Sequence, residues 1–325
     1  DTANDIHPPL YYWLLRLWTV IFGHTEVALR SLSATLGVLL VLTTAELGRR
    51  IYHSATGLAA ALIAALAPFQ VHYSQEARMY ILIALLASLS VLLFWWLLSQ
   101  EDRRLPCEGD VTRRIRWLPF SGQLLVLAWT AGLYTHYAFP LIIALCSGAY
   151  AAWLLVTRKR GCVGQRIARW LLFLALTLGL YAPWLGTAVR QLTAWPAPDA
   201  SADLVQQVHG IVATLVFGPS PSAGALPWAP ILFMIALAGA WPWPYFSREG
   251  QAGSANLDWL RSLLPLAWML APVAMILALG LYRDAYLKFL LIGSPAFALL
   301  LGRATLGPAG LLLGAAEPDA EGVTQ

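Results

Sequence analysis

Charge is what this sequence has least of. Asp, Glu, Lys and Arg make up 12% of its 325 residues, whereas hydrophobic residues make up 59% and the mean hydropathy is +0.64. Soluble domains carry roughly a quarter charged residues, so this scarcity excludes an ordinary soluble globular protein. The pI near 9.1 does not indicate nucleic-acid binding, because the basic residues lie between apolar runs, where membrane topology explains them.

Cysteine is also scarce, and familiar nucleotide-binding and hydrolytic motifs are missing. The three cysteines, Cys107, Cys146 and Cys162, fall in two predicted loops and one predicted span, which argues against a disulfide framework. The sequence contains no P-loop, dinucleotide fingerprint, zinc-metalloprotease helix or nucleophile elbow. ATP-driven and standard hydrolase functions therefore lack support.

Long apolar runs are what the sequence does have. Runs of about 17 to 25 residues, the length that crosses a bilayer, recur between short charged or proline-rich segments. Backbone in lipid must satisfy its own hydrogen bonds, so these runs predict helices and an all-α, polytopic integral membrane protein. The predicted spans are 27–49, 54–73, 77–99, 120–135, 137–157, 169–189, 227–246, 262–281 and 286–303.

The segment 8–22 predicts a different kind of helix. It is rich in Tyr and Trp, which prefer headgroup depth, and a further crossing here would invert the topology of everything after it. We therefore expect a helix that lies along the outer interface. Because the chain starts without Met on polar residues that resemble the interior of a loop, we also expect an N-terminally truncated protein.

The runs divide the chain into five parts. The long segment 190–226 is a candidate acceptor-binding cap, with a flexible connector as the alternative. The parts are a first extracytoplasmic loop with the interfacial helix (1–26), a transmembrane catalytic module (27–189), an extracytoplasmic loop (190–226), C-terminal transmembrane helices (227–316) and a polar tail (317–325).

Basic residues set the predicted orientation. Two basic segments are expected on the cytoplasmic side by the positive-inside bias. They are Arg158, Lys159 and Arg160 with Arg166 and Arg169, and the arginine-rich segment 103–116. The same topology brings the chemically interesting residues to the outer ends of their helices, although they were not used to set it. These residues are Asp5, His7, Glu76, Arg78, His136, Arg283 and Lys288. They can therefore share one extracytoplasmic site.

Asp5 and His7 are the candidate catalytic pair. A carboxylate and an imidazole two residues apart, followed by Pro8 and Pro9, can act as general base and partner or as ligands of a divalent ion. The structural alternative is a solvated loop in which Asp5 caps the following helix.

The remaining candidates bind rather than react. Arg78 is expected to grip an anionic headgroup phosphate, or else to form an ion pair with Glu76 at the start of a helix. His136 lies in a tight outer turn, where a hydrated, snorkelling imidazole is the alternative to a role in binding. Arg283 and Lys288 can bind a phosphate or pyrophosphate, or simply anchor the last span at the interface.

Taken together, these blocks resemble the GT-C superfamily of membrane glycosyltransferases. The resemblance is to the family 39 type, which includes protein O-mannosyltransferases and the bacterial aminoarabinose-to-lipid A transferase. The matching blocks are DIHPPLYY (5–12), FGHTEVALR (22–30), PFQVHYSQEARMY (68–80), YTHY (134–137), YAPW (181–184) and KFLLIGSPA (288–296). Their order and spacing cover nearly the whole chain.

The resemblance implies a sugar transferase of the bacterial inner membrane. It would move a sugar from a polyprenyl-phosphate donor to an acceptor hydroxyl on the extracytoplasmic face, with inversion and without a nucleic-acid partner. The residues expected to bind substrate and phosphate are Glu76, Arg78, Tyr80, His136, Arg283 and Lys288. His7 and Asp5 match the first outer loop of the family, but its usual candidate base lies upstream. Whether Asp5 is the base, positions the acceptor or binds a divalent ion is open.

Two other function classes compete with this interpretation. A polytopic transporter or lipid flippase would show internal repeats and broken helices with polar residues near the bilayer midplane. A non-catalytic scaffold would need no cluster of charges at the outer helix ends. Here the charges gather at those ends and no internal repeat is evident, so the sequence favours the transferase.

Overall fold

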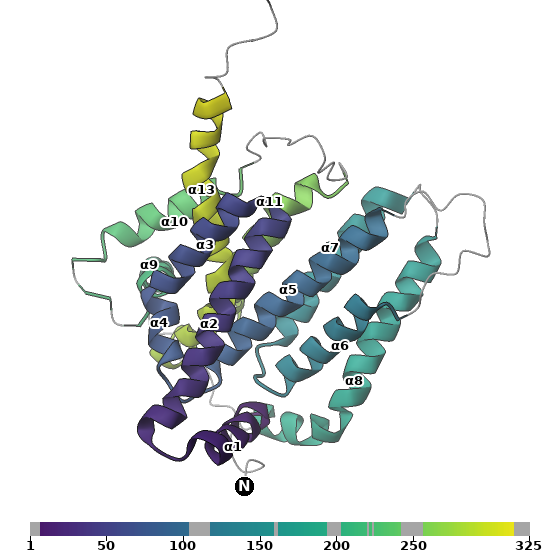
Figure 1. Ribbon diagram of the computed structural model, residues 1–325, viewed down its shortest axis with the longest axis vertical. Coiled ribbons are helices and arrows are strands. Elements are labelled where there is room, and N and C mark those ends of the chain that lie inside the picture. Colours follow the sequence, from purple (N-terminus) through teal and green to yellow (C-terminus); the bar gives the residue numbers. More distant parts are fainter. Residues whose placement is uncertain are drawn as a thin grey trace, which may run out of the picture.

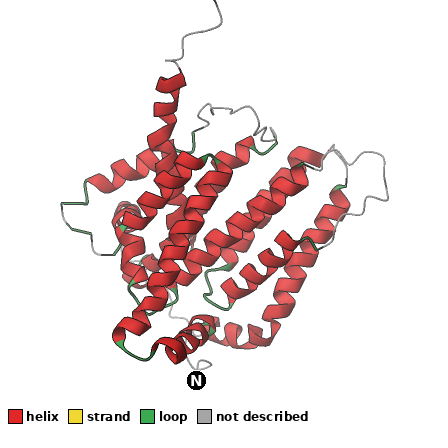
Figure 2. Cartoon of the chain, in the orientation of Figure 1, coloured by secondary structure: helices red, strands yellow, loops and turns green. Residues whose placement is uncertain are grey.

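The computed structural model describes residues 7–103, 118–158, 162–193, 203–219, 221–222, 224–241 and 256–314, with side chains through 306. Within these ranges all regular structure is helical (Figures 1 and 2). The elements are α1 (Leu10–Phe22), α2 (Glu26–Ile51), α3 (Ser54–Leu66), α4 (Pro68–Ser74), α5 (Tyr80–Asp102), α6 (Phe120–Leu133), α7 (Pro140–Thr157), α8 (Val163–Thr193), α9 (Leu204–Phe217), α10 (Trp228–Ala238), α11 (Asp258–Ala278), α12 (Asp284–Leu287), the 3₁₀ helix η2 (Lys288–Gly293) and α13 (Ser294–Gly314).

The all-α, polytopic membrane fold is confirmed. In the described chain, six helical segments are long and apolar enough to cross a bilayer, namely α2, α5, α7, α8, α11 and the segment Asp284–Leu306. The predicted span 54–73 is a pair of helices, α3 and α4, bent by 61°. The bend falls at Pro68, which begins α4 and has no N–H to continue the hydrogen bonding of α3. Two further predicted spans are the shorter apolar helices α6 and α10.

Close helix packing forms the centre of the bundle. The Cα atoms of Gly48 on α2 and Gly57 on α3 approach so closely that a Cβ added at Gly48 would lie 2.6 Å from the Gly57 Cα. Small residues at such contacts let helix backbones approach in a membrane, where dispersion contacts between helices drive packing. The α5 helix is buried along most of its length and packs against α2 and α6. It is therefore the central span to which the site described below is attached.

The α1 helix lies across one end of the bundle, as Figure 1 shows. Tyr11 is fully buried and its hydroxyl bonds to Ser33 Oγ at 2.8 Å, while Trp18 Nε1 donates to Ser31 Oγ at 2.9 Å. These two bonds fix α1 to α2. The opposite side of α1 is apolar and exposed, with Trp13, Leu17, Val20, Ile21 and Phe22 each more than half exposed. This distribution fits the predicted interfacial helix.

The bundle has two chemically distinct ends. Tyr80 begins α5 and Glu101 lies near its last residue, so a rise of 1.5 Å per residue separates them by about 30 Å. The candidate site lies at the Tyr80 end, together with α1. Arg49 and Arg50, which pair with Glu46 in the last turn of α2, lie at the other end. That the Tyr80 end is the extracytoplasmic one stays a prediction.

Candidate functional site

Lys288 and Tyr80 form the centre of the candidate site. Tyr80 is 2% exposed at the first position of α5, and Lys288 begins η2 directly after α12. The Lys288 ammonium lies 4.6 Å from the centroid of the Tyr80 ring, within the range of a cation–π contact. Two residues from distant parts of the sequence, both predicted to bind substrate, are therefore brought together.

His136 belongs to the same cluster and is buried. Its ring lies 6.3 Å from the Tyr80 ring and 4.8 Å from the Phe289 ring, centroid to centroid. The backbone N–H of Ala138 donates to His136 Nδ1 at 3.0 Å, which leaves the proton of the neutral ring on Nε2. Burial lowers the pKa of His136 to about 3, with smaller contributions from His7 and Lys288. The hydrated, snorkelling imidazole is thus wrong: the residue is a buried, neutral N–H donor.

His7 approaches the cluster from the start of the chain. Its ring centroid lies 6.4 Å from that of His136. The segment is held there because the backbone N–H of Leu10 donates to the carbonyl of Tyr134 at 3.0 Å, in the turn that also carries His136. Asp5, the predicted carboxylate of the catalytic pair, lies outside the described residues. The structure therefore brings one half of that pair to the cluster.

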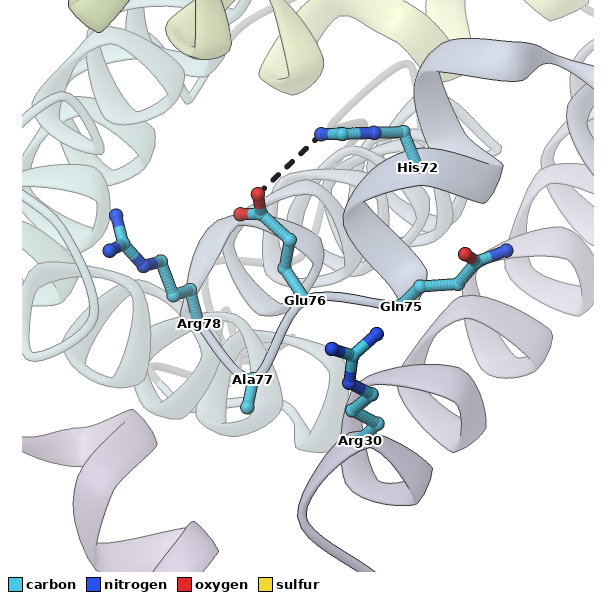
Figure 3. A pocket seen from close by; sticks show the side chains of 6 residues that line it. All are labelled: Arg30, His72, Gln75, Glu76, Ala77 and Arg78. Carbon is cyan, nitrogen blue, oxygen red and sulfur yellow. Dashed lines mark ion pairs between the residues drawn. The ribbon is translucent and has the colours of Figure 1, made fainter. Parts of the chain in front are cut away.

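Arg78 and Glu76 line an open pocket beside this cluster. Figure 3 shows its lining residues, Arg30, His72, Gln75, Glu76, Ala77 and Arg78, around a cavity of about 550 Å³. The ion pair between Glu76 and Arg78, the structural alternative to phosphate binding, is not among the ion pairs of the described side chains. Glu76 turns instead to His72, with 3.5 Å between Oε1 and Nε2, and its link to Arg78 is a backbone hydrogen bond.

Arg78 connects the pocket with the buried cluster. Its side chain is exposed, and its pKa is raised above the usual value, mainly through its polar interaction with Tyr80. The Tyr80 hydroxyl itself is buried and makes no hydrogen bond of normal geometry to any described residue. A buried hydroxyl of this kind costs free energy unless it meets a partner, so it marks a place where a ligand atom would be stabilising.

Arg283 is the N-cap residue of the short helix α12. Its carbonyl accepts from the backbone N–H groups of Tyr286 and Leu287 at 2.8 and 3.1 Å. Its guanidinium is not among the groups that line the open pocket. It therefore shares the end of the bundle with Lys288, while its role in substrate binding stays a prediction.

The described residues alone do not meet the requirements of a metal site. Among them, no group of three or more His, Cys, Asp and Glu side chains is placed to hold an ion. The predicted pair of metal ligands includes Asp5, which falls outside these residues. A divalent ion at Asp5 and His7 therefore stays a prediction.

An ionic cluster at the opposite end of the bundle was not expected from the sequence. Arg166 and Arg169, assigned above to the neighbourhood of a basic loop, lie within α8 and are each 3% exposed. Arg169 forms an ion pair with Glu101, whose other oxygen accepts from the Tyr150 hydroxyl at 2.9 Å. Asp102 accepts from Trp153 Nε1 and from Asn256 Nδ2, both at 3.1 Å. The cluster ties α5, α7 and α8 together.

Sequence reasoning also missed three residues of the open pocket. Arg30 on α2, His72 on α4 and Gln75 after it carry no motif that distinguishes them from residues at an ordinary interface. Their only signal was that they fall within the blocks FGHTEVALR (22–30) and PFQVHYSQEARMY (68–80). Because α2 packs against α4, residues of these two blocks line the same cavity.

Comparison with solved structures finds the same fold in two membrane enzymes. ArnT from Cupriavidus metallidurans in the apo state matches with a TM-score of 0.59 and 18% identity, over 95% of this chain and 53% of that one. ArnT bound to undecaprenyl phosphate gives a TM-score of 0.58 and 17% identity, over the same shares of the two chains. The apo oligosaccharyltransferase of Archaeoglobus fulgidus matches with a TM-score of 0.59 and 13% identity, over 96% and 44%.

The sequence itself matches a family model. The chain spans about half the length of the solved structures it resembles, and no curated protein matches it. Residues 6–186, more than half of the chain, match the model described as dolichyl-phosphate-mannose-protein mannosyltransferase. This match covers His7, Arg78, Tyr80 and His136. The chain therefore belongs to the dolichyl-phosphate-mannose-protein mannosyltransferase family, within the GT-C superfamily of membrane glycosyltransferases.

Proposed function

We propose that this chain transfers a sugar from a polyprenyl-phosphate donor to an acceptor hydroxyl, with inversion at the anomeric carbon. The acceptor is a lipid, a glycan or a protein. The reaction takes place on the extracytoplasmic face of the inner membrane of a bacterium. Family membership supports glycosyl transfer over transport, flipping or scaffolding, and the arrangement around Tyr80 supports a lipid phosphate as the leaving group.

One observation carries the proposal: two cations, Lys288 and Arg78, meet at the buried side chain of Tyr80. Lys288 lies against the Tyr80 ring, and Arg78 interacts with the same side chain from the open pocket. A phosphate at this hydroxyl would accept a hydrogen bond from Tyr80 and would face both positive charges. Hydrogen bonds between charged groups and phosphate oxygens are among the strongest in proteins.

A solved relative supports the class of ligand. ArnT of Cupriavidus metallidurans has been captured with undecaprenyl phosphate, a polyprenyl phosphate. At 17% identity this likeness shows the fold alone. That the present chain binds the same class of ligand is therefore part of the proposal. The apolar surfaces of the spanning helices would accommodate the polyprenyl tail while its phosphate meets the cations at the helix ends.

The proposed reaction is a single displacement. The acceptor oxygen forms a bond to the anomeric carbon as the bond from that carbon to the phosphate oxygen breaks, and the phosphate leaves with the electron pair. Arg78, Lys288 and Tyr80 stabilise the charge that grows on the phosphate. The acceptor proton passes to a carboxylate, for which Asp5 is our candidate, with His7 beside it. A divalent ion on Asp5 and His7 is the alternative role for that pair.

Binding of the lipid phosphate tests the proposal directly. We expect Lys288→Gln to weaken the binding of undecaprenyl phosphate to the purified protein by roughly tenfold, since a charged hydrogen bond is lost. Lys288→Arg, which keeps the charge, should retain most of the affinity. Arg16→Gln, on an exposed position of α1, controls for net charge. Equal affinity in Lys288→Gln and Arg16→Gln would remove Lys288 from the phosphate site.

A second variant tests the carboxylate. Asp5→Asn should abolish or strongly reduce release of polyprenyl phosphate from a lipid-linked sugar, while the protein stays in the membrane and still binds the lipid. Chelation by EDTA separates the two roles of Asp5, because a base needs no ion. Turnover at the wild-type rate in Asp5→Asn would exclude both roles.

A further inference from the structure

The open pocket contains a cation for which the reaction above has no use. Arg30 extends from α2 and Arg78 from the turn before α5, and Figure 3 shows both among the residues that surround the cavity, with Glu76 and Ala77 between them. The two guanidinium groups come from different elements that pack against each other through α2, α4 and α5. Both lie at the end of the bundle where the Tyr80 hydroxyl is buried.

The charge balance of this pocket is positive. Its lining residues include two arginines and a single carboxylate, that of Glu76, which Figure 3 shows turned toward His72. Arg30 pairs with Glu26 at 2.6 Å, but these side chains are 56% and 75% exposed. An exposed pair four residues apart on one helix is weak and screened by salt, so Arg30 can exchange Glu26 for a ligand anion.

We propose that this pocket is a second oxyanion site, in which Arg30 and Arg78 bind a phosphate group distinct from the one at Tyr80 and Lys288. The inference rests on the proposed function and adds a property of the substrates, namely that together they carry two anionic groups. The second group is either the outer phosphate of a diphosphate donor or a phosphate on the acceptor.

Arg78 makes the two sites adjacent. It lines the pocket and also interacts with Tyr80, so an anion at Arg30 and an anion at Tyr80 would flank the same guanidinium. A planar guanidinium offers five N–H donors and can serve two oxyanions on different edges, which an ammonium cannot do with the same geometry. The cavity of about 550 Å³ has room for a phosphate with its water.

Three probes and two variants test the second site in the purified full chain. The probes are inorganic phosphate, undecaprenyl phosphate and undecaprenyl diphosphate. Arg30→Gln removes the guanidinium that the first phosphate does not need, and Arg16→Gln is the control, with the same change of charge at an exposed position outside the pocket. Thermal unfolding of both variants, compared with the wild type, confirms that each is folded.

The result identifies the source of the second phosphate. If it belongs to the donor, the wild type binds the diphosphate roughly tenfold tighter than the monophosphate, and Arg30→Gln removes this difference. If it belongs to the acceptor, both lipids bind alike, but protein saturated with undecaprenyl phosphate still binds inorganic phosphate, and Arg30→Gln weakens that binding roughly tenfold.

One outcome would contradict the second oxyanion site and leave the phosphate site at Tyr80 and Lys288 unaffected. If Arg30→Gln matches Arg16→Gln with all three probes while undecaprenyl phosphate still binds, the pocket holds no phosphate. Failure of the proposed function looks different, because then neither lipid binds the wild type. In that case inorganic phosphate, measured on lipid-free protein, still decides the question: binding that depends on Arg30 supports the site, and its absence overturns it.

Discussion

Acid should destabilise the folded protein through His136, and the size of the effect follows from its burial. In the unfolded chain an imidazole titrates with a pKa of 6.5, whereas in the folded protein the pKa of His136 is about 3. Above pH 7 the ring is neutral in both states and contributes nothing to the pH dependence. As the pH falls through 6.5, His136 binds a proton in the unfolded chain but stays neutral in the folded chain. Stability is therefore lost progressively down to about pH 3.

The magnitude is within reach of an equilibrium measurement. Each pH unit between the two pKa values removes about 1.4 kcal/mol from the free energy of unfolding. From pH 7.5 to pH 5, the loss due to this one ring is therefore about 2 kcal/mol. His136→Asn is the matched variant, because the Asn side-chain oxygen can still accept from the Ala138 N–H while the titrating ring is gone.

The assay is reversible unfolding in mixed micelles, followed by circular dichroism at several pH values. Other titrating groups cancel in the difference between the wild type and His136→Asn, which should shift by about 2 kcal/mol in favour of the variant between pH 7.5 and pH 5. His209→Asn, at an exposed histidine of α9, is the control and should show the pH profile of the wild type. A difference that stays constant with pH would show that the His136 ring is not buried in its neutral form.

Three further predictions concern the bundle and its orientation. Glu101→Gln leaves Arg169 buried without its carboxylate, so we expect a loss of about 3 kcal/mol or more in the free energy of unfolding, and partial recovery when Arg169→Met is added; full stability of the single variant would contradict this. Gly57→Leu would place a Cβ 2.4 Å from the Ala45 carbonyl oxygen, so the folded protein should be lost from membranes, whereas Gly148→Leu, which meets open space, should be tolerated. In a cysteine-free background, Arg103→Cys should be labelled by an impermeant reagent only from the cytoplasmic side, and labelling from outside would reverse the proposed orientation.

Much of the fold could be predicted because hydropathy and the bilayer constrain it strongly. Each predicted span overlaps a helix of the structure, and the interfacial helix at 8–22 is α1. The convergence of Tyr80, His136 and Lys288 was also predictable, since the alternation of spans assigns helix ends to one side or the other. Topology of this kind fixes which end of the bundle a residue occupies.

What could not be predicted are the contacts within each end. Arg166 and Arg169 count as loop charges for the positive-inside bias, but the structure buries them against Glu101, a partner more than sixty residues earlier in the chain. His136 was weighed as a hydrated imidazole, since the sequence does not show that Phe289 closes over it. Arg30 drew no attention because its position in the pocket depends on how α2 packs against α4. These contacts depend on how neighbouring helices pack against one another, and the hydropathy pattern of the sequence does not show this packing.

Because α1 is attached to the turn beside the candidate site, the rate of the proposed reaction should depend on the thickness of the bilayer. The exposed apolar side chains of α1 should keep this helix at the surface of the lipid. The hydrogen bond from Leu10 to Tyr134 connects α1 to the turn that holds His136, so a shift of α1 would also move this turn. Of the cations proposed to bind the lipid phosphate, Lys288 lies in the spanning segment Asp284–Leu306 and Arg78 lies just before the spanning helix α5, and the lengths of these spans are fixed. Lipids with longer acyl chains should raise the surface relative to those helices and change turnover without altering a single side chain.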